Sequence, residues 1–319
     1  MSDQNAQPTL LTAWKGAQAR LKAAGIDSPS IDARLLLEAA TGAGRVDILT
    51  DPYRALAEAQ IRALDAMVER RLRREPVSRI LGRKGFWKIM LNVTPDVLSP
   101  RPDTETVVDV IVRAFPPNTA FDMADLGTGS GAILLAALAE RRGARGVGTD
   151  ISTEAIAVAR ENAANLDLNN RCTFMRTDWA AGFADASFDL VVSNPPYIPT
   201  ADIAGLDPEV REHDPHLALD GGPDGLQPYR DLAPEIARIL RPQGVFAVEI
   251  GWDQGQAVKA LFEAAGFTDV KVVKDLSDRD RVVTNGPDPR VGPIPEAEAP
   301  LQDRKSTRLN SKSHHDLVC

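Results

Sequence analysis

The chain has 319 residues and a formal net charge of −8, and its apolar and charged fractions are those of an ordinary globular protein. This length allows one large domain or two smaller ones. No run of about 18 apolar residues occurs, so the sequence predicts no membrane span. The polar first nine residues do not resemble a secretory signal. The negative charge argues weakly against a protein dedicated to binding nucleic acid.

The two cysteines, Cys172 and Cys319, are too few for a disulfide framework. A reducing cytoplasm is therefore the expected location.

Residues 1–80 are predicted to form a small helical domain. Residues 10–24 carry apolar side chains at helical spacing, and Gly25 follows them. Ser28 and Pro29 are typical of an N-cap followed by proline in the first turn, and they start a second helix that reaches about residue 40. Residues 55–72 form a third amphipathic segment, and no strand alternation is present.

Residues 81–100 have a different composition, with glycine, aromatic residues and short β-rich runs. We interpret this segment as a hairpin-like connector. The sequence Pro100-Arg101-Pro102 then leads into a helix over about residues 104–115.

Strands and helices alternate in the rest of the chain up to residue 285. The strands are expected at residues 121–126, 146–151, 172–177, 188–192 and 245–250, and the helices at 132–141, 153–165, 234–240 and 254–265. Residues 270–273 and 281–283 look like a closing pair of strands. This pattern predicts an α/β fold over residues 101–285, in which helices cover both faces of a Rossmann-like, doubly wound and mostly parallel sheet. The closing pair would form an antiparallel edge.

Residues 286–319 are rich in proline, glycine and polar residues and are expected to be disordered. The last sixteen residues resemble translated vector or adaptor sequence, a genuine basic tail being the alternative, so we exclude them from fold reasoning.

A glycine-rich loop, Asp-Leu-Gly-Thr-Gly-Ser-Gly at residues 125–131, joins the first of these strands to a helix. Glycines at such a place let the backbone turn tightly and approach a ligand. In the dinucleotide fingerprint the third glycine lies three residues after the second, whereas Gly131 lies two residues after Gly129. The match to a nicotinamide site is thus imperfect, and a tight turn that binds nothing is the alternative.

Polar residues also end the next two strands. Asp150 can accept hydrogen bonds from two ribose hydroxyls, or it can cap the following helix. Asp178 can accept from an adenine amino group, and Trp179 can pack on the ring or belong to the core. Because the carboxyl ends of parallel strands meet at one edge of a sheet, these residues predict a site for a nucleoside-containing cofactor.

Asn194-Pro195-Pro196-Tyr197 follows the fourth strand of the domain. The side-chain carbonyl of Asn194 and the main-chain carbonyl of Pro195 are two acceptors on a stiff loop, and together they can hold both N–H bonds of a planar NH₂ group. Tyr197 can pack over that group. The sequence therefore predicts a site that orients an amino or amide nitrogen toward the cofactor.

These motifs together resemble those of class I S-adenosylmethionine-dependent N-methyltransferases, and more closely those of the peptide chain release factor glutamine methyltransferases (the PrmC/HemK family). Three further segments look like that family, namely residues 31–37, 100–105 and 214–222. The resemblance covers roughly residues 10–285.

The resemblance implies transfer of a methyl group from S-adenosyl-L-methionine to the side-chain amide of the glutamine in the Gly-Gly-Gln loop of release factors. Asp150 would take the ribose and Trp179 would border the adenine. Residues that would line the methionine part of the cofactor are Gly127, Thr128, Gly129, Ser130 and Gly131. Residues that would hold the substrate amide are Asn194, Pro195, Pro196 and Tyr197, and Asn194 would also face the cofactor.

The resemblance also suggests that the helical domain grips a release factor. The basic residues between Arg70 and Lys88 would then contact an acidic face of that partner. An equally good interpretation is that these residues form a solvated helix end and linker with no partner. We expect a monomer, with neither a membrane nor nucleic acid as a direct partner. No metal is expected, because a proline separates His213 from His216 and no cysteine lies near them.

Three alternatives remain open from the sequence. The first is a glutamine methyltransferase that acts on a ribosomal protein. The second is an adenine-N6 methyltransferase of DNA or RNA, against which the acidic balance counts. The third is a dinucleotide-dependent oxidoreductase, against which the glycine spacing and the Asn-Pro-Pro-Tyr sequence count.

Overall fold

The computed structural model describes residues 7–291, which divide into two compact units. One unit contains the described residues up to Arg83 together with residues 207–213, and the other contains residues 84–206 and those from 214 onward. The adaptor-like sequence and most of the tail expected to be disordered lie outside the described residues. Within the described range, no helix is both long enough and apolar enough to cross a bilayer.

The first unit is helical, as expected. Its helices are α1 (Leu10–Ala23), α2 (Pro29–Thr41), α3 (Arg45–Thr50), α4 (Glu58–Leu72), α5 (Val77–Leu81) and α9 (Pro208–Arg211). Helix α1 starts at a capping box formed by Thr9 and Thr12, and α2 has its proline in the first turn and ends at Gly42 with φ of 71°. The short helices α3, α5 and α9 were not predicted, because four to six residues are too few to show a helical period.

A buried ion cluster joins three helices of this unit. Arg71 of α4 donates from Nε to Asp32 Oδ2 of α2 at 2.7 Å and from Nη2 to Glu209 Oε1 of α9 at 2.8 Å. The side chains of Arg71 and Asp32 are 4% and 9% exposed. Because a buried guanidinium without partners is costly, the cluster explains why residues 207–213 belong to the helical unit.

The second unit begins at Lys84, inside β1 (Arg83–Phe86), which forms a small two-stranded sheet with β2 (Ile89–Asn92) within the segment interpreted as a connector. Helix α6 (Glu105–Ala114) follows, preceded by the 3₁₀ turn η1 (Pro102–Thr104). Two further 3₁₀ turns, η2 (Thr200–Gly205) and η3 (His216–Ala218), lie in the long segment after the fourth predicted strand.

Seven strands of the described chain form the main sheet. They are β3 (Phe121–Leu126), β4 (Ala144–Asp150), β5 (Cys172–Arg176), β6 (Phe188–Ser193), β7 (Leu240–Glu249), β8 (Lys271–Lys274) and β9 (Asp280–Thr284). Their order is β5-β4-β3-β6-β7-β9-β8. The first five pair in parallel, and β9 pairs antiparallel with both β7 and β8. The mostly parallel sheet with an antiparallel edge is therefore confirmed.

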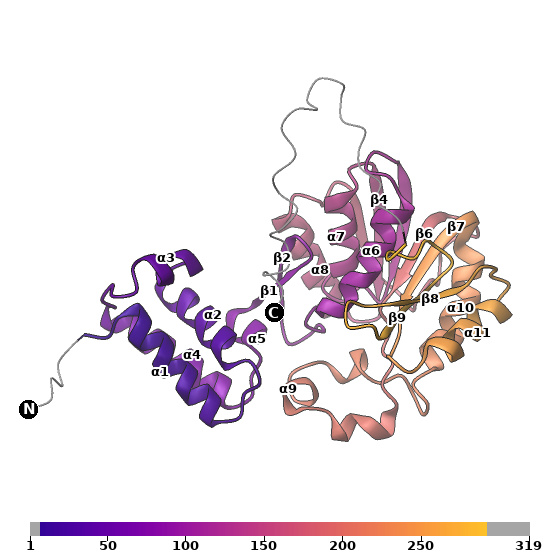
Figure 1. The fold of residues 1–319 in the computed structure, drawn as a ribbon. Helices are drawn as coiled ribbons and strands as arrows, with labels where there is room; N and C mark the ends of the chain where they lie inside the picture. Colours follow the sequence, from indigo (N-terminus) through magenta and orange to yellow (C-terminus); the bar gives the residue numbers. More distant parts are fainter. Residues whose placement is uncertain (1–6, 292–319) are drawn as a thin grey trace, which may run out of the picture. The chain divides into compact units, whose positions relative to one another are not determined.

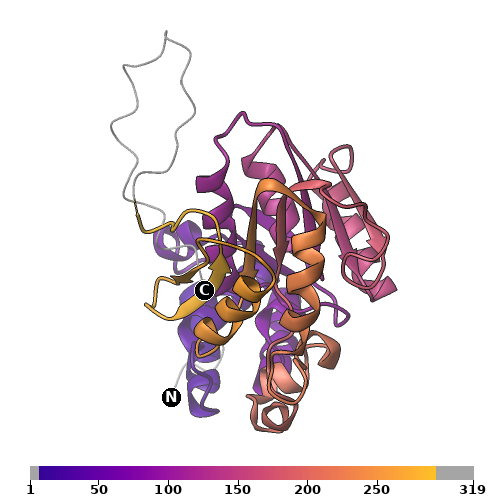
Figure 2. The same cartoon turned by 90° about the vertical axis from the view of Figure 1, so that its right-hand side faces the viewer.

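Alternate side chains of the central strands enter two separate cores. Met123 and Leu190 pack with α6, α7 (Ala132–Glu140) and α8 (Thr153–Asn165), whereas Leu126 and Val191 pack with α10 (Gln227–Ile239) and α11 (Gly255–Ala264). Figure 1 shows α7 and α8 on one side of the sheet and α10 and α11 on the other. In the turned view of Figure 2, the orange helices lie in front of the strands. Burial on both faces explains why these strands read as continuous apolar runs.

Helix α10 differs from its prediction, because it begins at Gln227 rather than at Pro234. Two prolines are present, and the first-turn position belongs to Pro228, while Pro234 lies inside the helix. A proline inside a helix removes one backbone hydrogen bond. The apolar face that includes Leu232 and Ile236 is fully buried against the sheet, and this burial offsets the loss.

We predict that Asp32→Ala lowers the free energy of unfolding by about 3 kcal/mol, because it leaves a buried cation short of one partner. Urea unfolding followed by circular dichroism measures the change. Arg62→Ala is the control, since it removes an ion pair to Glu58 whose side chains are 71% and 87% exposed. That pair is expected to contribute about 0.5 kcal/mol, and equal losses in the two variants would contradict the prediction.

Candidate active site at the carboxyl edge of the sheet

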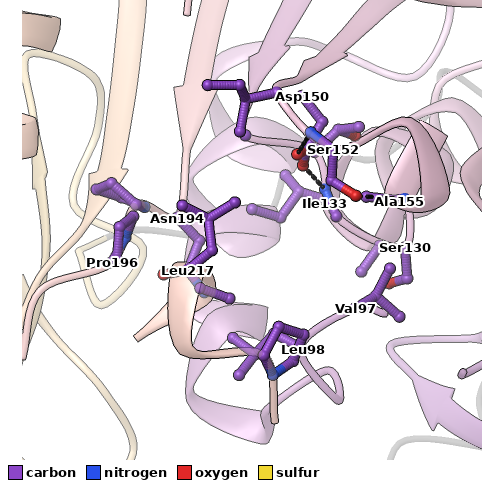
Figure 3. Close-up of a pocket in the computed structure, with 18 of the residues that line it drawn as sticks. Val97, Leu98, Ser130, Ile133, Asp150, Ser152, Ala155, Asn194, Pro196 and Leu217 are labelled. Atoms are coloured by element: carbon purple, nitrogen blue, oxygen red, sulfur yellow. Dashed lines mark hydrogen bonds between the residues drawn. The ribbon is translucent and has the colours of Figure 1, made fainter. Parts of the chain in front are cut away.

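A cavity lies at the carboxyl ends of β3, β4, β5 and β6. The chain runs from β3 outward to β4 and β5 and then returns to β6 on the other side of β3. Open α/β sheets bind ligands at such a reversal of strand order. Figure 3 shows Asp150 on one side of this cavity and Asn194 and Pro196 on another.

The glycine-rich loop is held to the end of β4 by main-chain contacts. The N–H of Thr128 donates to the Thr149 carbonyl at 2.8 Å, and the N–H of Gly129 donates to Asp150 Oδ2 at 2.9 Å. Gly127 and Gly129 have φ of 72° and 54°, which are left-handed values that favour glycine. Residues 127–130 all line the cavity.

Asp125 supports this loop from below. Its Oδ2 accepts from the Thr128 hydroxyl at 2.7 Å and from the Leu134 N–H at 3.3 Å, while Oδ1 has no hydrogen-bond partner among the described residues. The residue is 1% exposed. Burial raises the pKa of the Asp125 carboxyl to about 7, and repulsion from Asp150 acts in the same direction.

Asp150 lines the cavity and is not the cap of the next helix. Its Oδ1 accepts from the Ser152 N–H at 2.9 Å, and it is Ser152 that caps α8 by accepting from the Ala155 N–H. A carboxylate offers about four acceptor positions, so two hydrogen bonds leave room for two more. The sequence alternative of a helix N-cap is therefore settled in favour of Ser152.

Trp179 has an uncommon backbone conformation, with φ of 40°. Its carbonyl accepts from the Thr149 hydroxyl at 2.9 Å, and its ring lies so near the loop that a Cβ at Gly127 would be 3.2 Å from the indole. Trp179 lines the cavity and also packs against the core, so its core position is confirmed and its contact with an adenine stays a prediction. A strained bulky residue at a cavity is typical of a functional site. Asp178 lines the cavity as well.

The Asn-Pro-Pro segment begins where β6 ends. The Ser193 hydroxyl donates to the Leu126 carbonyl at 2.6 Å, which ties the last residue of β6 to β3. Asn194 donates from Nδ2 to the Thr104 hydroxyl at 3.2 Å. The Pro195 carbonyl accepts no protein hydrogen bond within the described residues. The cavity is lined here by Asn194, Pro195 and Pro196. Two acceptors remain available on these residues, namely Asn194 Oδ1 and the Pro195 carbonyl oxygen.

Two predicted site residues do not line the cavity. Tyr197 points its hydroxyl to Glu249 Oε1 at 3.4 Å and its carbonyl accepts from Gln254 at 2.9 Å, so its polar atoms face the protein interior. Gly131 starts α7, where a Cβ would lie 3.0 Å from the Leu135 side chain. The third glycine of the loop thus allows close packing of the helix.

The cavity has further lining residues that the sequence reasoning did not assign, in particular residues 96–98, 100, 101, 104, 215, 217 and 218. Buried Asp214 joins the two segments that carry most of them. Its Oδ1 accepts from the Ser99 N–H at 3.3 Å, and its Oδ2 accepts from Arg101 at 2.6 Å. A signal for both segments existed in the sequence, because residues 100–105 and 214–222 are two of the motifs quoted above.

Part of the basic run between Arg70 and Lys88 is occupied by ion pairs within the chain. Arg70 pairs with Glu75 at 2.5 Å, and Lys88 pairs with Glu140 at 2.6 Å. Arg71 is buried in the ion cluster described above. These residues therefore offer less free positive charge to a partner than the sequence suggests.

The fold and the site define a class I methyltransferase. Residues 12–82 match the PrmC N-terminal domain, and residues 118–284 match a methyltransferase domain. The chain is 63% identical over 285 residues to the release factor glutamine methyltransferase of Caulobacter vibrioides, which covers 89% of this chain and 99% of that protein. The protein of the same name from Rhodospirillum rubrum is 49% identical, with 82% and 80% of the two chains covered. The chain belongs to the release factor glutamine methyltransferase family.

We predict that Asp125→Asn changes how stability depends on pH. The pKa of Asp125 is raised in the folded protein, so its stabilising contribution is complete below pH 4 and is lost as the pH rises toward about 7. The wild type should therefore lose stability relative to the variant between pH 4 and pH 7. Urea unfolding of both proteins across this range tests the prediction, and a constant difference would contradict it.

Proposed function

We propose that this protein transfers a methyl group from S-adenosyl-L-methionine to the side-chain amide nitrogen of the glutamine in the Gly-Gly-Gln loop of peptide chain release factors. The observation that carries the proposal is the hydrogen bond from Asn194 Nδ2 to Thr104, because it leaves Asn194 Oδ1 as an acceptor at the cavity. Family membership and the 63% identity to a protein of that name support the choice of substrate.

The residues of the cavity fit the methyl donor. Asp150 has acceptor positions left for a ribose, and Trp179 offers an indole beside the loop. Glycine is favoured at residue 127, because φ there is 72° and a Cβ would approach the indole to 3.2 Å. When bound, S-adenosyl-L-methionine supplies an electrophilic methyl carbon, whose bond to sulfur is replaced by a bond to the amide nitrogen while that nitrogen loses one proton.

The chain's own contribution is placement and charge stabilisation. An amide nitrogen is a poor nucleophile, because its lone pair is delocalised into the carbonyl. Asn194 Oδ1 and the Pro195 carbonyl would accept the two N–H bonds, which fixes the plane of the amide and its distance from the donor. The same two oxygens stabilise the positive charge that develops on nitrogen. The proton leaves to water, since no side chain of the motif is placed to remove it.

The proposed partner is a release factor in the cytoplasm, and the test uses it directly. The protein is incubated with radiolabelled S-adenosyl-L-methionine and a purified release factor, or with the same factor carrying Gln→Asn in its Gly-Gly-Gln loop. Label should appear in the first reaction alone. Equal label in both would defeat the proposal, and label in a ribosomal protein instead would redirect it.

Asn194→Ala is expected to lower kcat by about 100-fold or more, since loss of one preorganised hydrogen-bonding group has this effect in other enzymes. Binding of S-adenosyl-L-methionine, measured by calorimetry, should stay within about 3-fold, because most residues assigned to that interaction are in the glycine-rich loop, Asp150 and Trp179. Asn285→Ala is a matched control, since Asn285 bonds Phe246 and Gly244 outside the cavity. Normal turnover in the Asn194 variant would exclude the proposed role of that side chain.

A further inference from the structure

A buried carboxyl group lies close to the Asn194 side chain. Glu249 ends β7 and is 1% exposed. One of its oxygens, Oε1, accepts from the Tyr197 hydroxyl at 3.4 Å, and the other, Oε2, has no geometric hydrogen-bond partner among the described residues. The reaction proposed above gives this carboxyl no task. Burying a carboxylate with so few hydrogen-bond partners costs free energy of folding, so a functional role would explain why Glu249 is there.

Thr104 lies between this carboxyl and Asn194. Its hydroxyl accepts from Asn194 Nδ2 at 3.2 Å, and Thr104 lies close enough to Glu249 to lower the pKa of that carboxyl. Thr104 is 4% exposed, so water does not compete freely for these contacts. The three side chains come from η1, the residue after β6 and the last residue of β7, and they form a relay from the core to the cavity.

The direction of the hydrogen bonds in this relay is fixed by the carboxylate. A hydroxyl has one proton, and an ionised carboxylate can only accept. Thr104 must therefore donate to Glu249, which leaves its lone pairs for Asn194. Asn194 must then turn its NH₂ group toward Thr104 and its Oδ1 away from it.

The direction matters because the two ends of an amide side chain have opposite hydrogen-bonding character. With Oδ1 at the cavity, Asn194 accepts an N–H bond from the substrate amide. In the flipped state its NH₂ group would meet the NH₂ group of the substrate, and both groups are donors. The two states have nearly the same shape, so the hydrogen-bond network decides between them.

We propose that Glu249 is a positioning residue that acts through Thr104 to set which end of the Asn194 amide faces the methyl acceptor. This inference rests on the proposed function of Asn194, and it assigns a role in the reaction to two residues outside the Asn-Pro-Pro-Tyr motif.

The charges around Glu249 define its pH dependence. Burial raises the pKa of Glu249 to about 7, Thr104, Arg281 and Tyr197 lower it, and Asp103 raises it. Arg281 of β9 is itself paired with Asp103 at 3.2 Å and with Asp275 at 3.3 Å. Its positive charge is therefore partly neutralised by these two carboxylates and stabilises ionised Glu249 less.

Tyr229 of α10 also faces this group, and its hydroxyl donates to the Glu249 main-chain carbonyl at 3.0 Å. As the pH falls through about 7, Glu249 gains a proton and can donate to Thr104 instead of accepting from it. The constraint on Asn194 is then lost, and kcat should fall with it.

The first experiment compares Thr104→Val with Thr104→Ser. The valine variant keeps the shape of the side chain but removes the relay, and kcat should fall by about 10-fold to 100-fold, the effect of one or two hydrogen bonds. Binding of S-adenosyl-L-methionine should not change, and the serine variant should keep a rate within about 3-fold of the wild type.

Thr284→Val is the matched control. Thr284 is a fully buried threonine whose hydroxyl donates to the Phe246 carbonyl and accepts from the Gly286 N–H, so it takes no part in the contacts of Thr104, Asn194 and Glu249. It should lose stability without losing kcat. If Thr104→Val and Thr284→Val lower stability equally and neither lowers kcat, Thr104 is structural and the proposal is wrong.

The second experiment records the pH dependence of kcat for Glu249→Gln. Glutamine can donate or accept, so it no longer fixes the direction of the relay. The variant should be slower at pH 8 and should lack the decline in kcat that the wild type shows below about pH 7. A wild-type rate together with a wild-type decline would overturn the proposal.

A double variant and Asn194→Ala complete the test. The double variant Thr104→Val with Glu249→Gln should be no slower than the slower single variant, because the two residues act in series. If the fold-losses in kcat of the two single variants multiply in the double variant, the relay is wrong. If Asn194→Ala is inactive while both single variants have wild-type kinetics, the relay alone fails. If Asn194→Ala is active, the proposed function of Asn194 fails first.

Discussion

The parallel pairing of β4, β3 and β6 is the constraint on which the site depends. Parallel strands bring their carboxyl ends to one edge, so residues that are far apart in the chain, such as Gly129, Asp150 and Asn194, reach one cavity. The pairing is enforced from both faces, since alternate strand residues enter two separate cores. A shift of one residue in the register of β6 would exchange its two faces and turn Asn194 away.

Carboxylates then hold the loops that this edge presents, and two of them, Asp125 and Asp214, are buried. Asp125 binds the glycine-rich loop to the start of α7, Asp150 binds it to the start of α8, and Asp214 binds residues 99–101 to the segment after it. Each carboxylate accepts at least one main-chain N–H group, so each fixes backbone, and Asp125 and Asp214 also hold the side chains of Thr128 and Arg101. Rigid loops reduce the entropy that would be lost when reactants are aligned. Glu249 extends the same principle from backbone position to the orientation of one amide.

The sequence was sufficient to predict the sheet and to place the glycine-rich loop, Asp150 and Asn194 at its carboxyl edge. Strand ends and tight turns have local signals in the sequence, which is why these features could be predicted. It was misleading at Pro234, where the burial of a whole helical face outweighs the local preference of proline. It could not place Tyr197, whose orientation depends on Glu249, a residue that looks like any other end of a strand. The lining residues near 97 and 217 could not be predicted either, because they are brought together through Asp214 by a contact between residues more than a hundred positions apart.

The membership of residues 207–213 in the helical unit has a consequence for how the chain can be divided. The peptide crosses between the two units after Arg83 and again on each side of α9. A fragment that starts at residue 84 would carry Glu209 without Arg71, and a fragment that ends there would carry the guanidinium without Glu209. Because the helical unit is made of two separate stretches of chain, a single cut cannot separate the two units without dividing the helical one.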